Sequence, residues 1–366
     1  MTVTWPDFWE WLIKSLVIVF GLLGGFAYTT YYERRWIARI QVRVGPNRAG
    51  PFGLLQPIAD AVKLIFKEEL TPARTYKLVF FLAPILTMVP SIVIAAVIPW
   101  GRSFELGGRT INLYLADLNV GVLYLMSVAS IAVYGIVLAG WSSNNKYAMM
   151  GGLRSSAQMI SYELTLGLMF VTAILPTGSM SLAAIVEGQG DWWFALIQPV
   201  GFLLFFIATL AEVNRAPFDM PEAEQELTAG YHTEYSGMKF ALFFMAEYQK
   251  MIVVSMIGAT LFLGGYLGPG VDRFWFLGPL YLFAKVFLLL GVMIWIRASW
   301  PRIRYDRLMA FGWKVMIPLS LAIVFITATG ILIESSWFIL ISSLLVGLVA
   351  VMVVYRSLRS KAYERA

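Results

Sequence analysis

Two long apolar stretches flank the segment Glu212–Phe244, which reads EVNRAPFDMPEAEQELTAGYHTEYSGMKFALFF. It contains His232, the only histidine of the chain. Six of its nine ionisable residues are carboxylates: Glu212, Asp219, Glu222, Glu224, Glu226 and Glu234. Charge at membrane depth is costly. We therefore take a carboxylate-rich segment between two apolar spans as a candidate functional site. A solvated loop with an acidic face is the alternative that the residues alone leave open.

The composition on either side of this segment is that of a polytopic membrane protein. Hydrophobic residues make up 59% of the 366 residues and charged residues 14%, and the mean hydropathy is +0.73. A helix needs about 20 apolar residues to cross a bilayer, and nine stretches come close to that length. They are 11–32, 78–99, 118–140, 157–177, 194–214, 238–264, 276–297, 314–334 and 337–355. The last two nearly adjoin and predict a helical hairpin, so the expected fold is an all-α transmembrane bundle of about 8–9 spans.

The chain lacks the residues that hold most redox cofactors and nucleotides. It has no cysteine and one histidine, which excludes a cysteine-ligated iron–sulfur cluster, a bis-histidine haem and a multi-histidine zinc or copper site. No Gly-Lys pair of a phosphate-binding loop and no full dinucleotide-binding glycine pattern occur. We therefore expect no metal and no cofactor bound by this chain. The first span lacks a following cleavage site and is interpreted as a true helix, not a signal peptide.

The distribution of positive charge predicts the topology. The loops 33–77, 141–156, 215–239 and 297–314 and the tail 356–366 together carry 22 lysines and arginines, whereas the opposite side carries four. Because basic residues accumulate on the cytoplasmic side, we expect the N-terminus outside and the large loops and C-terminus in the cytoplasm. The net charge of +6 fits anionic lipid and partner surfaces, and nothing in the sequence calls for nucleic acid.

The first of these loops contains an amphipathic stretch. Between Leu54 and Phe66, apolar residues recur at helical spacing and alternate with Asp60, Lys63 and Lys67. The stretch is too short to span a bilayer and predicts a helix that lies in the membrane interface. From the residues alone, this helix is either a surface anchor or part of a functional site.

Three glutamates in predicted spans are candidates for a functional role. Glu163 lies a turn or two inside the fourth span, Glu212 near the inner end of the fifth, and Glu247 about 13 Å into the sixth, given the helical rise per residue. Lys250 follows Glu247 at a spacing that lets both share a helix face. Buried carboxylates at graded depth, together with water, are what a proton path requires. The alternative is structural, with each acid paired to a lysine to fix helix register.

The acidic loop adds Glu222, Glu224 and Glu226 to this set. If this part is helical, Glu222 and Glu226 share a face, and crowded carboxylates raise one another's pKa values and titrate as a unit. Such a cluster would respond to a nearby change of charge. A plain acidic loop would not, and the sequence does not decide between the two.

Four long segments resemble one family. They are Glu33–Glu68 (ERRWIARIQVRVGPNRAGPFGLLQPIADAVKLIFKE), Ala139–Leu164 (AGWSSNNKYAMMGGLRSSAQMISYEL), Ala211–Tyr248 and Trp295–Lys314 (WIRASWPRIRYDRLMAFGWK). Together they resemble the H subunit of the proton-pumping NADH:quinone oxidoreductase, respiratory complex I, whose mitochondrial counterpart is subunit 1. The resemblance implies one membrane domain over residues 1–335. Residues 336–366 resemble an additional C-terminal span and basic tail present in only some bacterial members.

The resemblance also implies a function. In that family this subunit joins the hydrophilic arm to the membrane arm, forms much of the quinone chamber and its entry portal, and couples quinone reduction to proton translocation. The positions that correspond to the chamber and portal are Glu33, Arg34, Arg35, Asp60, Arg215 and Asp219. Those that correspond to the proton path and its coupling are Glu163, Glu212, Glu247, Glu222, Glu224 and Glu226.

The catalytic groups and cofactors are expected on neighbouring subunits. Quinone is the implied substrate, protonated by a residue of a neighbour, and FMN and iron–sulfur clusters belong to the hydrophilic arm, which holds the terminal cluster. Antiporter-like and small membrane subunits and lipid are further implied partners, and the implied location is the bacterial plasma (inner) membrane. One departure is Ser130, which stands where some bacterial relatives carry a glutamate.

Two rival functions remain on the sequence alone. The first is the related membrane subunit of an energy-converting hydrogenase, or of a complex I-like enzyme with an electron donor other than NADH. The second is a self-contained ion transporter, against which stands the absence of an inverted repeat and of paired broken spans.

Overall fold

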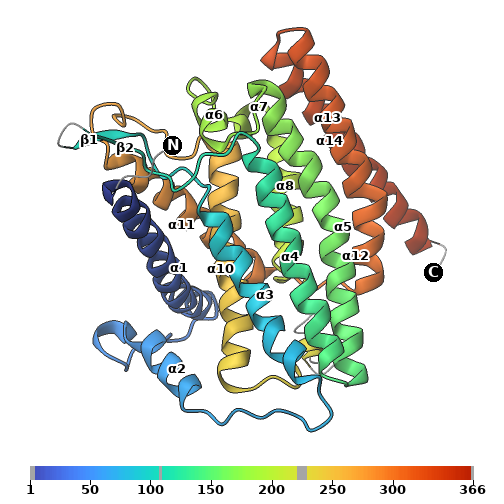
Figure 1. Cartoon of the computed structure of the whole chain (residues 1–366). Helices are drawn as coiled ribbons and strands as arrows, with labels where there is room; N and C mark the ends of the chain where they lie inside the picture. The colour runs from blue at the N-terminus through green and yellow to red at the C-terminus, as the bar shows by residue number, and fades with distance from the viewer. Residues whose placement is uncertain (1–4, 107–108, 221–228, 364–366) are drawn as a thin grey trace.

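The computed structural model describes residues 5–106, 109–220 and 229–363 of the chain. Apart from one short hairpin, its regular elements are helices (Figure 1). In chain order they are α1 (Trp5–Ile40), η1 (Pro51–Gly53), α2 (Gln56–Ile65), α3 (Lys77–Ala95), β1 (Phe104–Leu106), β2 (Arg109–Ile111), α4 (Gly121–Ser142), α5 (Lys146–Thr177), α6 (Leu182–Glu187), α7 (Phe194–Ile197), α8 (Pro199–Glu212), η2 (Gly230–His232), α10 (Gly237–Phe262), α11 (Leu277–Ser299), α12 (Tyr305–Phe311), η3 (Gly312–Met316), α13 (Ile317–Leu332) and α14 (Ser336–Tyr363).

Long apolar helices form a bundle around α10. Eight helical stretches in the described residues are long and apolar enough to cross a membrane, which confirms the predicted transmembrane bundle. α10 is apolar on all sides from Met251 to Phe262 and is buried over that length, as expected for a helix at the centre of a membrane bundle. Its neighbours include α1, α3, α8 and α11 (Figure 1).

The fifth predicted span, 194–214, is broken in two. Pro199 occupies the first turn of α8 and follows the four-residue helix α7. Because proline lacks the N–H that would continue the preceding helix, the span breaks at this point. α8 has 14 residues, about 21 Å at the helical rise. Glu212 is its last residue, so this helix ends and the chain turns inside the bundle.

Several predicted spans are longer in the structure than the apolar stretches indicate. α1 extends to Ile40 and α5 starts at Lys146, because polar turns at their inner ends continue the helix beyond the apolar run. The predicted hairpin of the last two spans is confirmed, since α13 and α14 pack side by side (Figure 1). α14 lies at the edge of the bundle, and only 11% of its most apolar stretch is buried.

The loops gather at two opposite ends of the bundle (Figure 1). The β1–β2 hairpin, in which Glu105 pairs with Thr110, lies with α6 and α7 at one end. α2 lies at the other, with the loop between α2 and α3. This grouping matches the two sides assigned by the charge count, while which side faces the cytoplasm stays a prediction.

The predicted amphipathic helix is present as α2. It packs beside the inner ends of α1 and α10, and its side chains Ile58, Val62 and Ile65 are exposed, as is Phe66 just after its end. A helix of a soluble globular protein would bury such an apolar stripe against the core. An apolar face left open next to membrane helices is suited to lipid or to an apolar ligand.

Candidate functional site

The turn after α8 is fixed by a buried glutamine of α5. Gln158 Nε2 donates to the carbonyl oxygens of Ala211 and Phe218, each at 2.8 Å, and to Oδ1 of Asn214 at 3.2 Å. The Ile303 N–H also donates to Pro217 O at 3.0 Å. These bonds satisfy backbone carbonyls at and after the end of α8, which have no partner within a helix. They hold the turn that carries Arg215 in one position.

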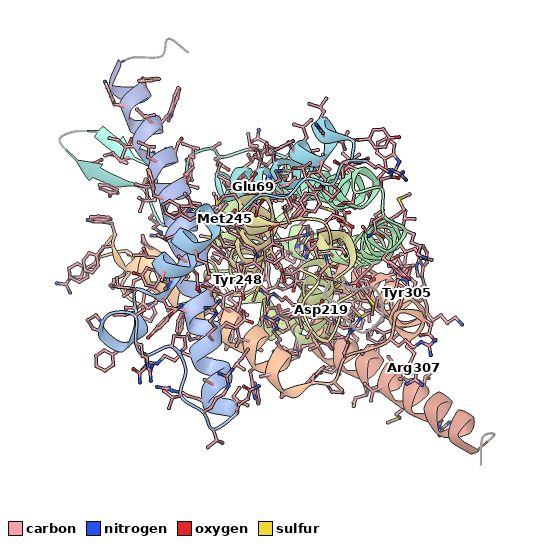
Figure 2. The ribbon with its side chains drawn as sticks, turned by 90° about the horizontal axis from the view of Figure 1, so that it is seen from below. Glu69, Asp219, Met245, Tyr248, Tyr305 and Arg307 are labelled. Atoms are coloured by element: carbon pink, nitrogen blue, oxygen red, sulfur yellow. The ribbon has the colours of Figure 1, made fainter. Side chains whose placement is uncertain are left out.

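Arg215 lies at the centre of a buried ionic cluster. Its Nη1 is 3.4 Å from Glu33 Oε1 and its Nε is 2.6 Å from Glu247 Oε1. Arg297 of α11 makes a further ion pair with Glu33, and the guanidinium of Arg215 lies 4.2 Å from the centre of the Tyr248 ring. Side chains from α1, α10, α11 and the turn after α8 thus meet in one cluster. In Figure 2, seen from the end where α2 lies, Tyr248 lies between Met245 and Asp219.

The electrostatics of this cluster favour a permanently charged arginine. Burial alone would lower the pKa of Arg215, but the carboxylates of Glu247 and Glu33 together raise it above its ordinary value. Removing one member of such a buried cluster leaves the opposite charge unpaired. Glu33 Oε2 is buried and has no hydrogen-bond partner within the described parts of the chain, so it is an acceptor that a bound water or ligand would satisfy.

A second ionic pair lies deeper in the bundle. Glu212 is 4% exposed, and Lys250 Nζ donates to its Oε1 at 2.6 Å. The sequence suggests that Lys250 shares a helix face with Glu247, but the structure pairs the lysine with Glu212 and pairs Glu247 with Arg215. The reason is geometric, because the end of α8 presents Glu212 directly to Lys250. Further along, the Ser130 hydroxyl donates to Glu163, so Ser130, where some relatives have an acid, supports the acid of α5.

Two small cavities lie beside these groups. The first, called the inner cavity, has a volume of about 40 Å³, and its lining includes Glu247, Glu212, Lys250 and His232. The second, called the middle cavity, has about 50 Å³, and its lining includes Glu212, Lys250 and Glu163. Glu212 and Lys250 line both. The predicted acids Glu163, Glu212 and Glu247 therefore line two neighbouring cavities that share Glu212 and Lys250.

The remaining predicted chamber and portal residues lie nearer the α2 end. Arg34 pairs with Asp60 of α2, and Arg35 donates to Tyr31 and, at 2.9 Å, to the carbonyl of Phe52. These contacts join α1 to the α2 segment, outside the buried cluster.

The acidic loop is described only in part. Asp219 is half-buried next to the turn that carries Arg215. Glu222, Glu224 and Glu226, predicted to titrate as a unit, lie outside the described residues, so their role stays a prediction.

Sequence reasoning misses three members of the site. Arg297 lies in the segment WIRASW, where the sequence gives no sign that it faces Glu33. Gln158 is an uncharged residue in a long span, and its burial among backbone carbonyls is visible only in the fold. His232 stands out as the only histidine, but no sequence pattern assigns it a role. It is buried, and burial lowers its pKa to about 3, so the imidazole is neutral near pH 7.

The fold and this site define a class: a multi-pass helical membrane protein with ionisable side chains that line two neighbouring cavities inside the bundle. Comparison with known proteins is more specific. The family model described as NADH dehydrogenase matches residues 13–328. The chain is similar to the second H subunit of NADH-quinone oxidoreductase of Geobacter metallireducens (52% identical, 88% of this chain and 95% of the relative) and to the H subunit of the Rhodospirillum rubrum enzyme (50% identical, 88% and 96%). The chain therefore belongs to the H-subunit family of the proton-translocating NADH-quinone oxidoreductase, complex I, and is one membrane component of that multi-subunit enzyme.

Proposed function

We propose that this chain forms much of the quinone chamber and entry portal at the junction with the hydrophilic arm, and that its buried carboxylates couple quinone reduction to proton translocation. The observation that carries the proposal is the continuous row from Glu33, Arg215 and Glu247 through Glu212 to Glu163. Its deeper members line two cavities that share Glu212 and Lys250. Acids that only fixed helix register would not need to line cavities large enough for water.

The coupling follows from charge balance. Quinone accepts two electrons and two protons to become quinol, with the electrons supplied by the hydrophilic arm. A change of charge beside Glu33 and Arg215 alters the field at Glu247, because a buried pair is poorly screened. Glu247 and Glu212 face the same cavity, so a proton change at one shifts the protonation equilibrium of the other. Glu163 extends the row toward the neighbouring membrane subunits.

The portal lies where α2 meets α1 and α10. Arg34 and Asp60 tie α2 to α1, and Lys239 of α10 is 3.3 Å from Glu69 in the loop after α2. Glu69 and Met245 mark this border in Figure 2. The exposed apolar face of α2 gives a long isoprenoid tail a surface continuous with the membrane.

The portal is tested by reversing one ion pair. We expect Asp60→Arg, which places two cations together, to raise the KM for quinone by about two- to fivefold with kcat little changed, since an exposed pair contributes about 0.2–1 kcal/mol. The double variant Arg34→Asp/Asp60→Arg restores the pair and should restore the KM. Equal KM values in all three proteins would refute this role for α2.

The proposed orientation is tested by labelling. The charge excess of 22 against four places Asn47 and Ala223 in the cytoplasm and Gly108 outside. In this cysteine-free chain, cysteines introduced at Asn47 or Ala223 should react with an impermeant maleimide only in inverted vesicles, and a cysteine at Gly108 only in intact cells. Labelling of Asn47→Cys in intact cells would contradict the orientation.

The genes that flank this one test the electron donor. Genes for the NADH-binding and quinone-chamber subunits are expected beside it. A gene for a hydrogenase large subunit in their place would favour the energy-converting hydrogenase instead.

A further inference from the structure

The inner cavity contains a side chain that the proposed row does not use. His232 lies in η2, between α8 and α10, and is 8% exposed. Its ring is enclosed by aromatic neighbours, with the Tyr231 ring centre at 3.8 Å and that of Phe243 at 5.5 Å. It nevertheless lines the same cavity as Glu212, Glu247 and Lys250. The imidazole is thus a polar group that lines a cavity of the proposed path, while the side chains around it are aromatic.

Most polar groups at this cavity already have partners. Glu212 Oε1 accepts from Lys250, Asn214 Oδ1 accepts from Gln158, and the Thr87 hydroxyl donates to Ala83 O at 2.8 Å. Two polar atoms of the lining residues lack such a partner. Glu212 Oε2 and His232 Nε2 are buried and have no hydrogen bond within the part of the chain that the structure describes. Buried polar atoms are costly unless paired, so two such atoms on residues that line one cavity call for partners that the described residues do not supply.

Water is the partner that fits this space. A buried water needs roughly 10–15 Å³ of accessible space and two to four polar neighbours, and this cavity offers about 40 Å³. Water in this cavity can donate to Glu212 Oε2, and it can either donate to or accept from His232 Nε2, whichever tautomer the imidazole has. Because burial lowers the pKa of His232 and keeps it neutral, the ring adds no cation beside Lys250 and would act through a hydrogen bond.

We propose that His232 orders water in the inner cavity, and that this water links Glu247 to Glu212. His232 is then a positioning residue: it holds the water that carries the proton and does not itself carry the proton. The inference rests on the proposed coupling function, because it supplies the missing connection between two of its carboxylates.

Two substitutions separate hydrogen bonding from packing. His232→Phe preserves an aromatic ring among Tyr231 and Phe243 but removes both nitrogens. His232→Gln packs less well but places an amide near the position of Nε2. We expect His232→Phe to lower inhibitor-sensitive quinone reduction and proton pumping by about fivefold or more per assembled complex and to raise the solvent deuterium isotope effect, while His232→Gln stays near the wild type.

Which of the two variants is the more active distinguishes a role in hydrogen bonding from a role in packing. A role in packing alone predicts the opposite order, with phenylalanine tolerated better than glutamine and the isotope effect unchanged. Either that order or full activity of His232→Phe would overturn the proposal. Glu212→Gln is measured in parallel: if it is impaired while His232→Phe is normal, only the water link fails, and if both are normal, the coupling function fails as well.

Discussion

Replacing Glu212 with glutamine is expected to leave the complex assembled and to lower inhibitor-sensitive quinone reduction by at least about tenfold, since one proton-transfer group typically contributes about a hundredfold or more. Glutamine keeps the volume and one hydrogen-bonding oxygen for Lys250, but it removes the group that can bind and release a proton. Glu212 lines both the inner and the middle cavity, as do Thr87, Ala132 and its ion-pair partner Lys250. Among these four shared residues it is the only carboxylate, so no other acid takes its place there.

A purely structural Glu212 predicts a different result. The loss of its charge would leave the partly buried Lys250 without an opposite charge, and the expected consequence is lower thermal stability or assembly, with normal turnover per assembled complex. Both quantities should therefore be measured on the same purified complex. Glu187→Gln is the matched control, because Glu187 is exposed at the end of α6, at the opposite end of the bundle from α2.

Arg215→Ala is expected to abolish most quinone reduction while NADH oxidation with an artificial acceptor persists. On the proposed function, the acceptor takes electrons upstream of the quinone site, from a site that we expect on another subunit. Alanine removes the charge that Glu33 and Glu247 share, and breaking such a buried cluster costs about 3–5 kcal/mol locally. That cost is enough to displace Glu247 and the turn after α8 from the arrangement the site requires.

The comparison needs controls for charge and for assembly. Arg215→Lys keeps a cation but loses the planar fork that reaches two carboxylates, so we expect it to retain part of the activity. Arg273→Ala, which replaces an exposed arginine in the loop before α11, should behave like the wild type. If Arg215→Ala lowered both activities in proportion at normal assembly, a role at the quinone site would be wrong.

The sequence predicts the parts of the site that depend on composition and local periodicity. Apolar run length predicts most spans, helical spacing predicts α2, and the cost of buried charge singles out Glu163, Glu212 and Glu247. What it cannot predict is pairing, because partners come from helices far apart in the chain. Lys250 is three residues from Glu247, yet it binds Glu212, 38 residues away.

Other features depend on how the bundle closes. Arg297 and Glu33 are 264 residues apart, and no local pattern brings them together. In the sequence, α8 cannot be told from the second part of a full-length span. Pro199 and the residues after Glu212 are only weak signals of a short helix that ends within the bundle. The orphan nitrogen of His232 is likewise visible only once the aromatic rings around it are in place.

The most direct test of the coupling role measures quinone reduction and proton pumping together in sealed, inverted membrane vesicles. Glu212→Gln and the double variant Glu163→Gln/Glu247→Gln are compared with Glu187→Gln, all normalised to assembled complex. If quinone chemistry drives these protons, blocking the protons must slow the chemistry, so both rates should fall together in the first two and stay normal in the third. Normal quinone reduction and normal pumping in both Glu212→Gln and the double variant would contradict the account and leave the chain as a wall of the quinone chamber and a bridge between the arms.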